Sequence, residues 1–281
     1  MSSVASIQLS SGPNIRANLL EVSKYLEEIS KTQSKLVVLP ENFALMPEDD
    51  LSFLDNAEDI GSGPIQEFIS ESAKKYKLWI IAGTIPIKTN TPKKVTSTTL
   101  VYNNAGEVVS RYDKIHLFDV ELPNSNESYN ESEVFQPGKE LKVIETPVGI
   151  VGLAICYDLR FPELFRLLHA SKVEIIVLYT RPLIVLPAAF TEQTGKVHWE
   201  TLVKARAIEN LCYMITSCQD GYHISGRRTH GDSMIVNPWG QIMSRITSGS
   251  GFIESEINHK QLKSIREKFP VLEHINLIGD K

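Results

Sequence analysis

The fold class is indicated most clearly by the stretch Gly149-Ile-Val-Gly-Leu-Ala-Ile-Cys156-Tyr-Asp-Leu-Arg-Phe-Pro162-Glu163. This stretch joins an apolar strand to a helix through a cysteine. The run from Ile150 to Ile155 is apolar, as expected for a buried strand, and proline is a residue type that opens helices. A strand-to-helix elbow exposes the side chain of Cys156 above the sheet and leaves the Tyr157 N–H free to face a developing oxyanion. The pattern therefore predicts an α/β fold. Taken alone, Cys156 is either placed for nucleophilic attack or simply ends a buried strand, since free cysteines are among the most buried residues.

Apolar runs of strand length recur on both sides of this stretch. They are Val4 to Leu9, Lys35 to Leu39, Trp79 to Gly83, Thr98 to Tyr102, Val173 to Leu178, Tyr213 to Ser217 and Met234 to Val236. Apolar faces of helical period lie between the early runs, over residues 15–29 and 65–73. The later runs follow one another at hairpin spacing, with turn signals at 104–106 and 238–240. We therefore expect an α/β protein with mixed sheets and, because no linker or repeat divides the chain, one domain over residues 1–281.

One segment, Phe118 to Pro137, has neither the period of a helix nor that of a strand. It is rich in Asn, Ser, Glu and Pro, which predicts a long loop. It begins just after Lys114, and loops of this length often carry function.

Charge and composition exclude several classes of protein. The 34 acidic and 29 basic residues are mixed along the chain and give a net charge of −5, so no basic block is available to bind nucleic acid. No window reaches the 18 or more apolar residues that would suggest a membrane span. The first residues alternate apolar and polar side chains, unlike a signal peptide, so we expect a cytoplasmic protein that does not bind a membrane.

The three cysteines, Cys156, Cys212 and Cys218, lack the paired spacing of a zinc site or a disulfide framework. Cys212 and Cys218 flank an apolar run, where cysteine usually acts as a small buried residue. The sequence also has no glycine-rich phosphate loop and no nucleotide-binding fingerprint, so we predict neither a metal nor a cofactor.

A cysteine nucleophile needs a nearby base or positive charge. Glu41 follows the apolar run Leu36-Val-Val-Leu-Pro, and Lys114 also follows a strand-like segment; taken singly, each could equally be a solvated surface residue. A Cys-His pair is the second possibility, and its candidate bases are His116, His169, His198, His223 and His230.

Three blocks of the chain resemble the signature blocks of the nitrilase superfamily of carbon–nitrogen hydrolases, and they occur in the same order. These blocks are Leu39-Pro-Glu41-Asn-Phe, Tyr112-Asp-Lys114-Ile-His and Gly152-Leu-Ala-Ile-Cys156-Tyr-Asp-Leu-Arg-Phe-Pro-Glu. The similarity extends through 194–210 and 237–240 and so covers nearly the whole chain. The resemblance implies a four-layer α-β-β-α sandwich with two mixed central sheets. It also implies a homodimer or a higher homo-oligomer that pairs through helices.

The resemblance further implies a chemistry. Cys156 would attack a linear amide, Glu41 would act as general base, and Lys114 with the Tyr157 N–H would hold the oxyanion. The products would be an acid and ammonia, formed through a cysteine acyl-thioester. Glu131 falls where the Nit branch of the superfamily carries a further glutamate that contacts this lysine.

A substrate carboxylate could be bound by Arg160 or Arg206, although each could equally pair with Glu163 or Glu209. Within the superfamily the chain looks most like the Nit branch, whose members act on deaminated glutathione or on ω-amides of 2-oxo acids. The segment from Gln219 to His223, followed by Arg228, favours deaminated glutathione.

Alternatives to that substrate are 2-oxoglutaramate, as for an ω-amidase, and N-carbamoyl amines. A non-enzymatic interaction module would be expected only if Glu41, Lys114 or Cys156 were replaced, and all three are present. Two departures from the family pattern weaken the substrate assignment. An apparent insertion from Tyr179 to Val185 contains Arg181, and Asp232 stands where related amidases commonly have histidine.

Overall fold

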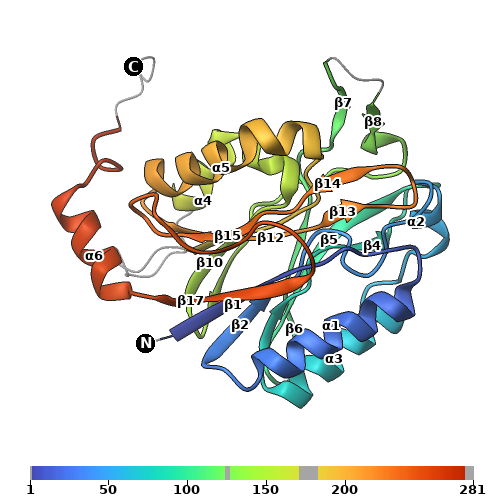
Figure 1. The fold of residues 1–281 in the computed structure, drawn as a ribbon, viewed down its shortest axis with the longest axis horizontal. Coiled ribbons are helices and arrows are strands. Elements are labelled where there is room, and N and C mark those ends of the chain that lie inside the picture. The colour runs from blue at the N-terminus through green and yellow to red at the C-terminus, as the bar shows by residue number, and fades with distance from the viewer. Residues whose placement is uncertain (1, 124–126, 171–182, 276–281) are drawn as a thin grey trace.

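Two mixed β-sheets lie between two pairs of helices in the computed structural model, which describes residues 2–123, 127–170 and 183–275 (Figure 1). The first sheet has the strand order β17-β1-β2-β3-β5-β4, and β6 pairs with β5. Its strands are β1 (Ser2–Gln8), β2 (Ser34–Val38), β3 (Trp79–Ile81), β4 (Ile85–Lys88), β5 (Val95–Tyr102), β6 (Val108–Asp113) and β17 (Gly251–Ile257). In this sheet β1, β2 and β3 run parallel to one another, and the outer strands are antiparallel.

The second sheet has the order β16-β15-β12-β11-β10-β9 and the same plan, with three parallel strands (β10, β11 and β12) flanked by antiparallel ones. Its strands are β9 (Val143–Thr146), β10 (Gly149–Leu153), β11 (Leu183–Ala188), β12 (Tyr213–Cys218), β15 (Ser233–Val236) and β16 (Ile242–Ile246). The longer helices are α1 (Ile15–Ile29), α3 (Pro64–Tyr76), α4 (Pro162–Ala170), α5 (Glu192–Glu209) and α6 (His259–Lys268), and α2 (Ser52–Asp55) is a single turn. The predicted α/β class with two mixed sheets is confirmed.

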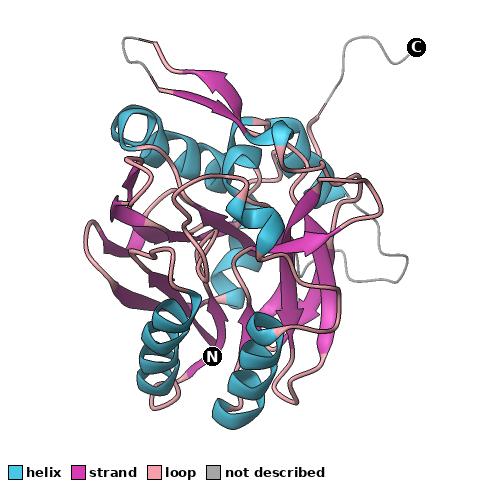
Figure 2. Cartoon of the chain, turned by 90° about the vertical axis from the view of Figure 1, so that its right-hand side faces the viewer, coloured by secondary structure: helices cyan, strands magenta, loops and turns pink. Residues whose placement is uncertain are grey.

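Successive side chains along a strand point into different cores, and this alternation builds the layers. On β2, Leu36 and Val38 belong to the core that the two sheets share, whereas Val37 packs with Val22 and Leu26 of α1 in the core on the opposite face. This alternation is the two-residue period of a strand that is buried on both sides. The shared core continues into α4 and α5, so the layers run α1 and α3, first sheet, second sheet, α4 and α5 (Figures 1 and 2).

The two long helices of the first layer form where the sequence predicts them. The side chain of Asn14 accepts a hydrogen bond from the Ala17 N–H at 3.0 Å and so caps the first turn of α1. Pro64 opens α3, and Lys77 ends it in the left-handed conformation at φ 57°. Both helices bury an apolar stripe, which is the surface that the sheet covers.

Two predictions about loops need correction or fall outside the described residues. The segment Phe118 to Pro137 is not a plain loop, because it contains the hairpin of β7 (Asp119–Glu121) and β8 (Ser128–Asn130) and a 3₁₀ turn, Glu131–Glu133. The strand predicted over 173–178 and Arg181 lie outside the described residues. The apparent insertion lies there in part, and its last residues, from Leu183, begin β11 and pair with both β10 and β12.

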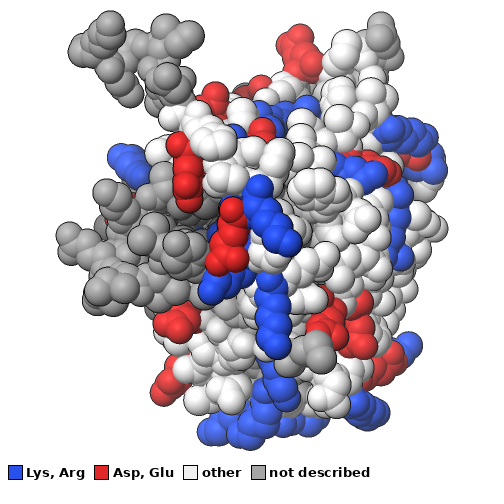
Figure 3. Space-filling view, turned by 90° about the vertical axis from the view of Figure 1, so that its left-hand side faces the viewer, with Lys and Arg blue, Asp and Glu red and all other residues white. Residues whose placement is uncertain are grey.

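Acidic and basic side chains are interspersed on the face drawn in Figure 3, with uncharged areas between them. No helix among residues 2–123, 127–170 and 183–275 is long and apolar enough to cross a membrane. Within the same ranges, no cluster of three or more His, Cys, Asp or Glu side chains is arranged to hold a metal ion.

Candidate active site

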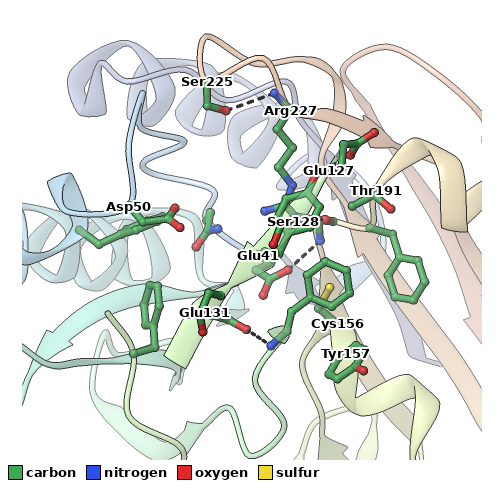
Figure 4. A pocket seen from close by; sticks show the side chains of 18 of the residues that line it. Glu41, Asp50, Glu127, Ser128, Glu131, Cys156, Tyr157, Thr191, Ser225 and Arg227 are labelled. Carbon is green, nitrogen blue, oxygen red and sulfur yellow. Dashed lines mark hydrogen bonds between the residues drawn. The ribbon is translucent and has the colours of Figure 1, made fainter. Parts of the chain in front are cut away.

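A cavity of about 460 Å³ opens beside the carboxyl ends of the central strands, and Glu41, Lys114 and Cys156 all line it (Figure 4). Glu41 follows β2 and Lys114 follows β6, both in the first sheet, whereas Cys156 follows β10 in the second. The three signature blocks thus meet where the two sheets face each other. The hairpins β7–β8 and β13 (Asp220–Tyr222)–β14 (Arg228–His230) lie over this end of the molecule (Figure 1).

Cys156 occupies a sharp elbow. Its φ is +45°, in the left-handed region that residues with a Cβ rarely adopt, and its side chain is 6% exposed. The carboxylate of Asp158 holds this backbone in place, because one of its oxygens accepts the Ile155 N–H at 2.9 Å and the Tyr112 O–H at 2.7 Å. Backbone strain at a residue that its surroundings hold so firmly is typical of a functional site.

The second oxygen of Asp158 binds His116 and so fixes the segment that carries Lys114. It accepts the His116 backbone N–H at 3.1 Å and lies 2.6 Å from His116 Nδ1, while the imidazole stacks on Phe161 with ring centroids 3.6 Å apart. The side chain of His116 therefore joins the lysine block to the cysteine block. None of His116, His198, His223 and His230 lines the cavity, and the side chain of His169 lies outside the described residues.

Backbone contacts position Glu41. Its carbonyl accepts a hydrogen bond from Gln219 Nε2 at 3.1 Å, and the Leu39 N–H donates to Ile81 O at 3.0 Å. Gly83 is required nearby, because a Cβ at this position would lie 1.9 Å from Pro40 O. The carboxylate of Glu41 accepts Lys114 Nζ on one oxygen at 2.9 Å and the Ala189 N–H on the other at 2.8 Å.

Lys114 lies between two carboxylates. Its ammonium is 2.9 Å from Glu41 Oε1 and 2.9 Å from each carboxylate oxygen of Glu131, and its side chain is only 2% exposed. Glu131 is itself held by the Phe118 N–H, which donates to Oε2 at 2.6 Å. The contact between Glu131 and Lys114 that the family resemblance implies is therefore present.

The charges of these groups follow from their surroundings. Burial raises the pKa of Glu41, but the charge and the hydrogen bond of Lys114 outweigh it, so the net pKa is lowered and the carboxylate is ionised at neutral pH. Burial alone would lower the pKa of Lys114, and the carboxylates of Glu131 and Glu41 raise it instead. Burial, followed by the charge of Glu41, raises the pKa of the Cys156 thiol, which is therefore protonated at rest. The resting site is a thiol beside a carboxylate that can accept its proton.

Aromatic rings and acids complete the wall of the cavity. Phe118, Tyr157 and Phe190 form a wall around the thiol, and the ring centroids of Phe118 and Tyr157 are 5.0 Å apart. At the solvent side the lining changes to four exposed carboxylate residues, Glu48, Asp49, Asp50 and Glu127, which we call the acidic rim.

The two arginines chosen from the sequence do not line this cavity. Arg206 is buried, and its guanidinium donates to Leu159 O at 3.0 Å and to Glu209 at 2.8 Å, the alternative partner that the sequence allowed. Arg160 lies over the rings of Phe190 and Tyr157 and contacts His198 at 3.3 Å. Both arginines therefore support the site from outside the cavity.

Arg227 is the cavity residue that sequence reasoning missed. It belongs to the turn between β13 and β14 and extends into the cavity (Figure 4). The adjacent Arg228, which drew attention in the sequence, turns outward to Glu192 at 3.1 Å and to the ring of Tyr222. The only signal in the sequence is the pair of arginines in a glycine-containing turn, and that pair does not say which one faces inward.

Asp232, which stands where related amidases commonly have histidine, does not line the cavity. Its carboxylate pairs with Arg245 through two hydrogen bonds of 2.5 and 2.8 Å, and its backbone carbonyl accepts the indole N–H of Trp199 at 2.8 Å. The change at this position is therefore accommodated by an ion pair behind the pocket wall.

Comparison with known proteins gives matches over nearly the whole chain. The model of the carbon–nitrogen hydrolase family matches residues 3–267. A deaminated glutathione amidase from Yersinia enterocolitica is 40% identical over 98% of this chain and 93% of its own length. The omega-amidase NIT3 of Saccharomyces cerevisiae is 35% identical over 95% of this chain and 91% of its own length. The crystal structure of Saccharomyces cerevisiae Nit3, a member of branch 10 of the nitrilase superfamily, has a TM-score of 0.83 and 30% identity over 96% of this chain and 94% of that one.

Proposed function

Because the chain belongs to the carbon–nitrogen hydrolase family and is a cysteine-dependent amidase, we propose that Cys156, Glu41 and Lys114 carry its catalysis. The observation that carries this proposal is the contact of Lys114 Nζ with both Glu41 and Glu131 in the cavity that holds the thiol.

We further propose that residues 1–281 form one hydrolase domain that acts in the cytoplasm. A reducing compartment would keep the buried free thiol of Cys156 available for attack.

The reaction begins when the thiol of Cys156 passes its proton to Glu41 and the sulfur attacks the amide carbon. Lys114 and the Tyr157 N–H hold the oxyanion of the tetrahedral intermediate. Protonated Glu41 then gives its proton to the leaving amine, and an acyl-thioester remains on Cys156. Glu41 next takes a proton from water, which attacks the thioester and releases the carboxylic acid. The sulfur of Cys156 leaves with the electron pair of the broken bond and takes the proton back from Glu41, which restores the thiol and the carboxylate.

Lys114 must exchange one hydrogen bond to take part in this reaction. An ammonium has three N–H donors, and at rest it faces one oxygen of Glu41 and both oxygens of Glu131. The oxyanion replaces one oxygen of Glu131, which keeps the Phe118 N–H as a partner. Glu131 thus acts as a positioning residue that holds the lysine ready for the oxyanion.

Deaminated glutathione is the substrate that we propose first, since several relatives are named for it, including the bacterial protein with 40% identity. It carries a 2-oxoglutaryl group on the amine of Cys-Gly, so hydrolysis of this amide yields 2-oxoglutarate and Cys-Gly. The ammonia expected from the sequence therefore needs correction for this substrate, because ammonia is released only from a primary amide such as 2-oxoglutaramate, the substrate class of an ω-amidase. An N-carbamoyl amine would instead give carbon dioxide with ammonia and an amine.

The test is to incubate the purified protein with each of these amides and to identify the products by mass spectrometry. Release of Cys-Gly and 2-oxoglutarate from deaminated glutathione supports the first choice. Turnover of 2-oxoglutaramate alone moves the assignment to an ω-amidase with the same catalytic groups. If neither is hydrolysed and an N-carbamoyl amine is, the proposed substrate class is wrong.

The pH profile distinguishes a Glu base from a His base. Because Lys114 lowers the pKa of Glu41 below its ordinary value of 4.5, kcat/KM should fall only as the pH drops below that value, where Glu41 becomes protonated and cannot accept the thiol proton. Between about pH 6 and about pH 8 the profile should be flat. A Cys-His pair would instead place an acid limb near pH 6.5, the ordinary pKa of histidine. Initial rates in overlapping buffers measure this directly.

We also propose that the chain associates with itself through its outer helices α4 and α5. Large apolar side chains are exposed there, with Leu167 at 55%, Val197 at 70% and Ile208 at 48%. Analytical ultracentrifugation should therefore give a mass that is a multiple of 31.5 kDa, and Val197→Asp should lower it. Leu20→Asp, on the opposite outer layer at 73% exposure, is the matched control and should leave the mass unchanged. A monomeric mass for the unaltered chain would contradict the proposal.

A further inference from the structure

The cavity contains a guanidinium that does not use all of its hydrogen-bond donors. Arg227 Nε is buried and has no hydrogen-bond partner among the described residues. Its Nη2 donates to the carbonyl of Ala189, and the guanidinium lies 5.2 Å from the ring centroid of Tyr129. Among the described residues, the hydrogen bonds and ring contacts of this guanidinium include no carboxylate. A half-buried cation left in this state is ready to accept an anion.

The turn that carries Arg227 is firmly held. The His223 N–H donates to Arg227 O at 2.9 Å, and the Gly226 N–H donates to His223 O at 2.9 Å. The imidazole of His223 is buried between Ser11 O at 3.0 Å and the hydroxyl of Thr229 at 2.7 Å. The guanidinium is therefore presented from a fixed backbone, as a specific binding group requires.

Among the charged side chains of the cavity, Arg227 is the one best placed to bind an anion. Among the described lining residues the only other basic side chain is Lys114, whose ammonium already faces Glu41 and Glu131. The acidic rim, which includes Asp50 and Glu127, would repel an anion at the solvent side. An anionic group of a substrate thus finds its favourable place inside, at Arg227.

We propose that Arg227 binds a carboxylate on the acyl part of the substrate and so makes the enzyme select amides of dicarboxylic acids. The acyl part stays on Cys156 after the amine has left, so it is the part that remains in the cavity, while the leaving group departs past the acidic rim. A single residue, Ala189, links Arg227 to Glu41. Its carbonyl accepts a hydrogen bond from Arg227, and its N–H donates to the carboxylate of Glu41. The inference rests on the proposed amidase function and adds to it the residue that determines acyl specificity.

The test compares two amides that differ only in this carboxylate. 2-Oxoglutaramate carries it, and levulinamide has a methyl group in its place. With Arg227→Met, kcat/KM for 2-oxoglutaramate should fall by about 10- to 150-fold, mainly through KM, which is the range expected for one hydrogen-bonded charge pair. The value for levulinamide should change by less than about threefold. Arg227→Lys should recover part of the loss, since it restores the charge without the forked donors.

Arg228→Met is the matched control, because it removes the neighbouring guanidinium, which points to Glu192 outside the cavity. It should leave the ratio of the two kcat/KM values unchanged. An equal loss with both amides in Arg227→Met would show that Arg227 only supports the backbone near Glu41, and no loss with either would also overturn the proposal.

Binding is measured separately so that the inference does not depend on turnover. Calorimetric titration of 2-oxoglutarate into Cys156→Ala should give a dissociation constant that rises at least about tenfold when Arg227→Met is added. If the unaltered enzyme hydrolyses neither amide, the proposed function fails while the titration still decides the role of Arg227. If 2-oxoglutarate binds both variants equally, or binds neither, Arg227 is not the anion site.

Discussion

Replacing Cys156 with alanine should abolish turnover while the protein stays folded. The substitution removes the only atom that can form the thioester, so we expect kcat to fall by at least about 10⁴-fold. Alanine fills the same elbow with a smaller side chain, and Asp158 still holds the Ile155 N–H, so the melting temperature should change little. Ammonia release from 2-oxoglutaramate and thermal unfolding followed by circular dichroism measure the two effects.

Cys212→Ala provides the matched control for a buried cysteine. Cys212 is fully buried in the shared core, away from the cavity, and its sulfur lies 3.7 Å from Arg206 O. Its loss should lower the free energy of unfolding by about 1 kcal/mol and leave kcat within about twofold. Residual activity above about one part in a hundred in Cys156→Ala would rule out Cys156 as the nucleophile.

Lys114→Met should have the second largest effect, because it damages both catalysis and stability. Methionine keeps most of the volume of lysine but removes the oxyanion donor, which we expect to cost at least about 10³-fold in kcat/KM. It also leaves the buried carboxylates of Glu41 and Glu131 without their cation, and breaking a buried ion pair in this way typically costs about 3–5 kcal/mol of unfolding free energy. Initial rates and urea unfolding at pH 8 measure the two losses.

The two losses in Lys114→Met can be separated. Burial already raises the pKa of Glu131 in the unaltered protein, and without the ammonium it also raises that of Glu41 above the unfolded value of 4.5, so the variant loses stability as the pH rises through and above that value. The stability deficit should therefore be smaller at pH 5 than at pH 8. Adding Glu131→Gln should recover much of the stability at pH 8 and none of the activity. A double variant as unstable as Lys114→Met would show that the lysine is not needed to compensate these charges.

The elements that local patterns determine could be predicted from the sequence. The apolar runs that become β2, β10 and β12 are nearly continuous because these strands are buried on both sides, and turn residues separate them. The three signature blocks could be recognised because each places its key residue within three residues of the end of a strand. The family resemblance stated from those blocks is confirmed by the family match over residues 3–267.

The contacts that bring distant segments together could not be predicted. Arg227 and Arg228 are neighbours of the same type, and which one enters the cavity depends on the hydrogen bonds that His223 makes to Ser11 and Thr229. The hairpin β7–β8 escaped notice because each strand has only three residues and a single large apolar or aromatic side chain, Val120 or Tyr129, which is too few to show an apolar alternation. Arg206 lies in a motif block, yet it packs against Leu159 and Glu209 in the fold.

Glu41 and Lys114 follow strands β2 and β6 of one sheet, whereas Cys156 and Ala189 follow β10 and β11 of the other. Hydrolysis therefore requires that the two sheets have packed against each other. A growing chain that has folded only its first half contains Glu41 and Lys114 but not Cys156. The thiol acquires its partners only once the second half is in place, so reactivity arises at the last stage of assembly. Enzyme activity recovered during refolding should therefore lag behind the recovery of secondary structure and follow the formation of the shared core.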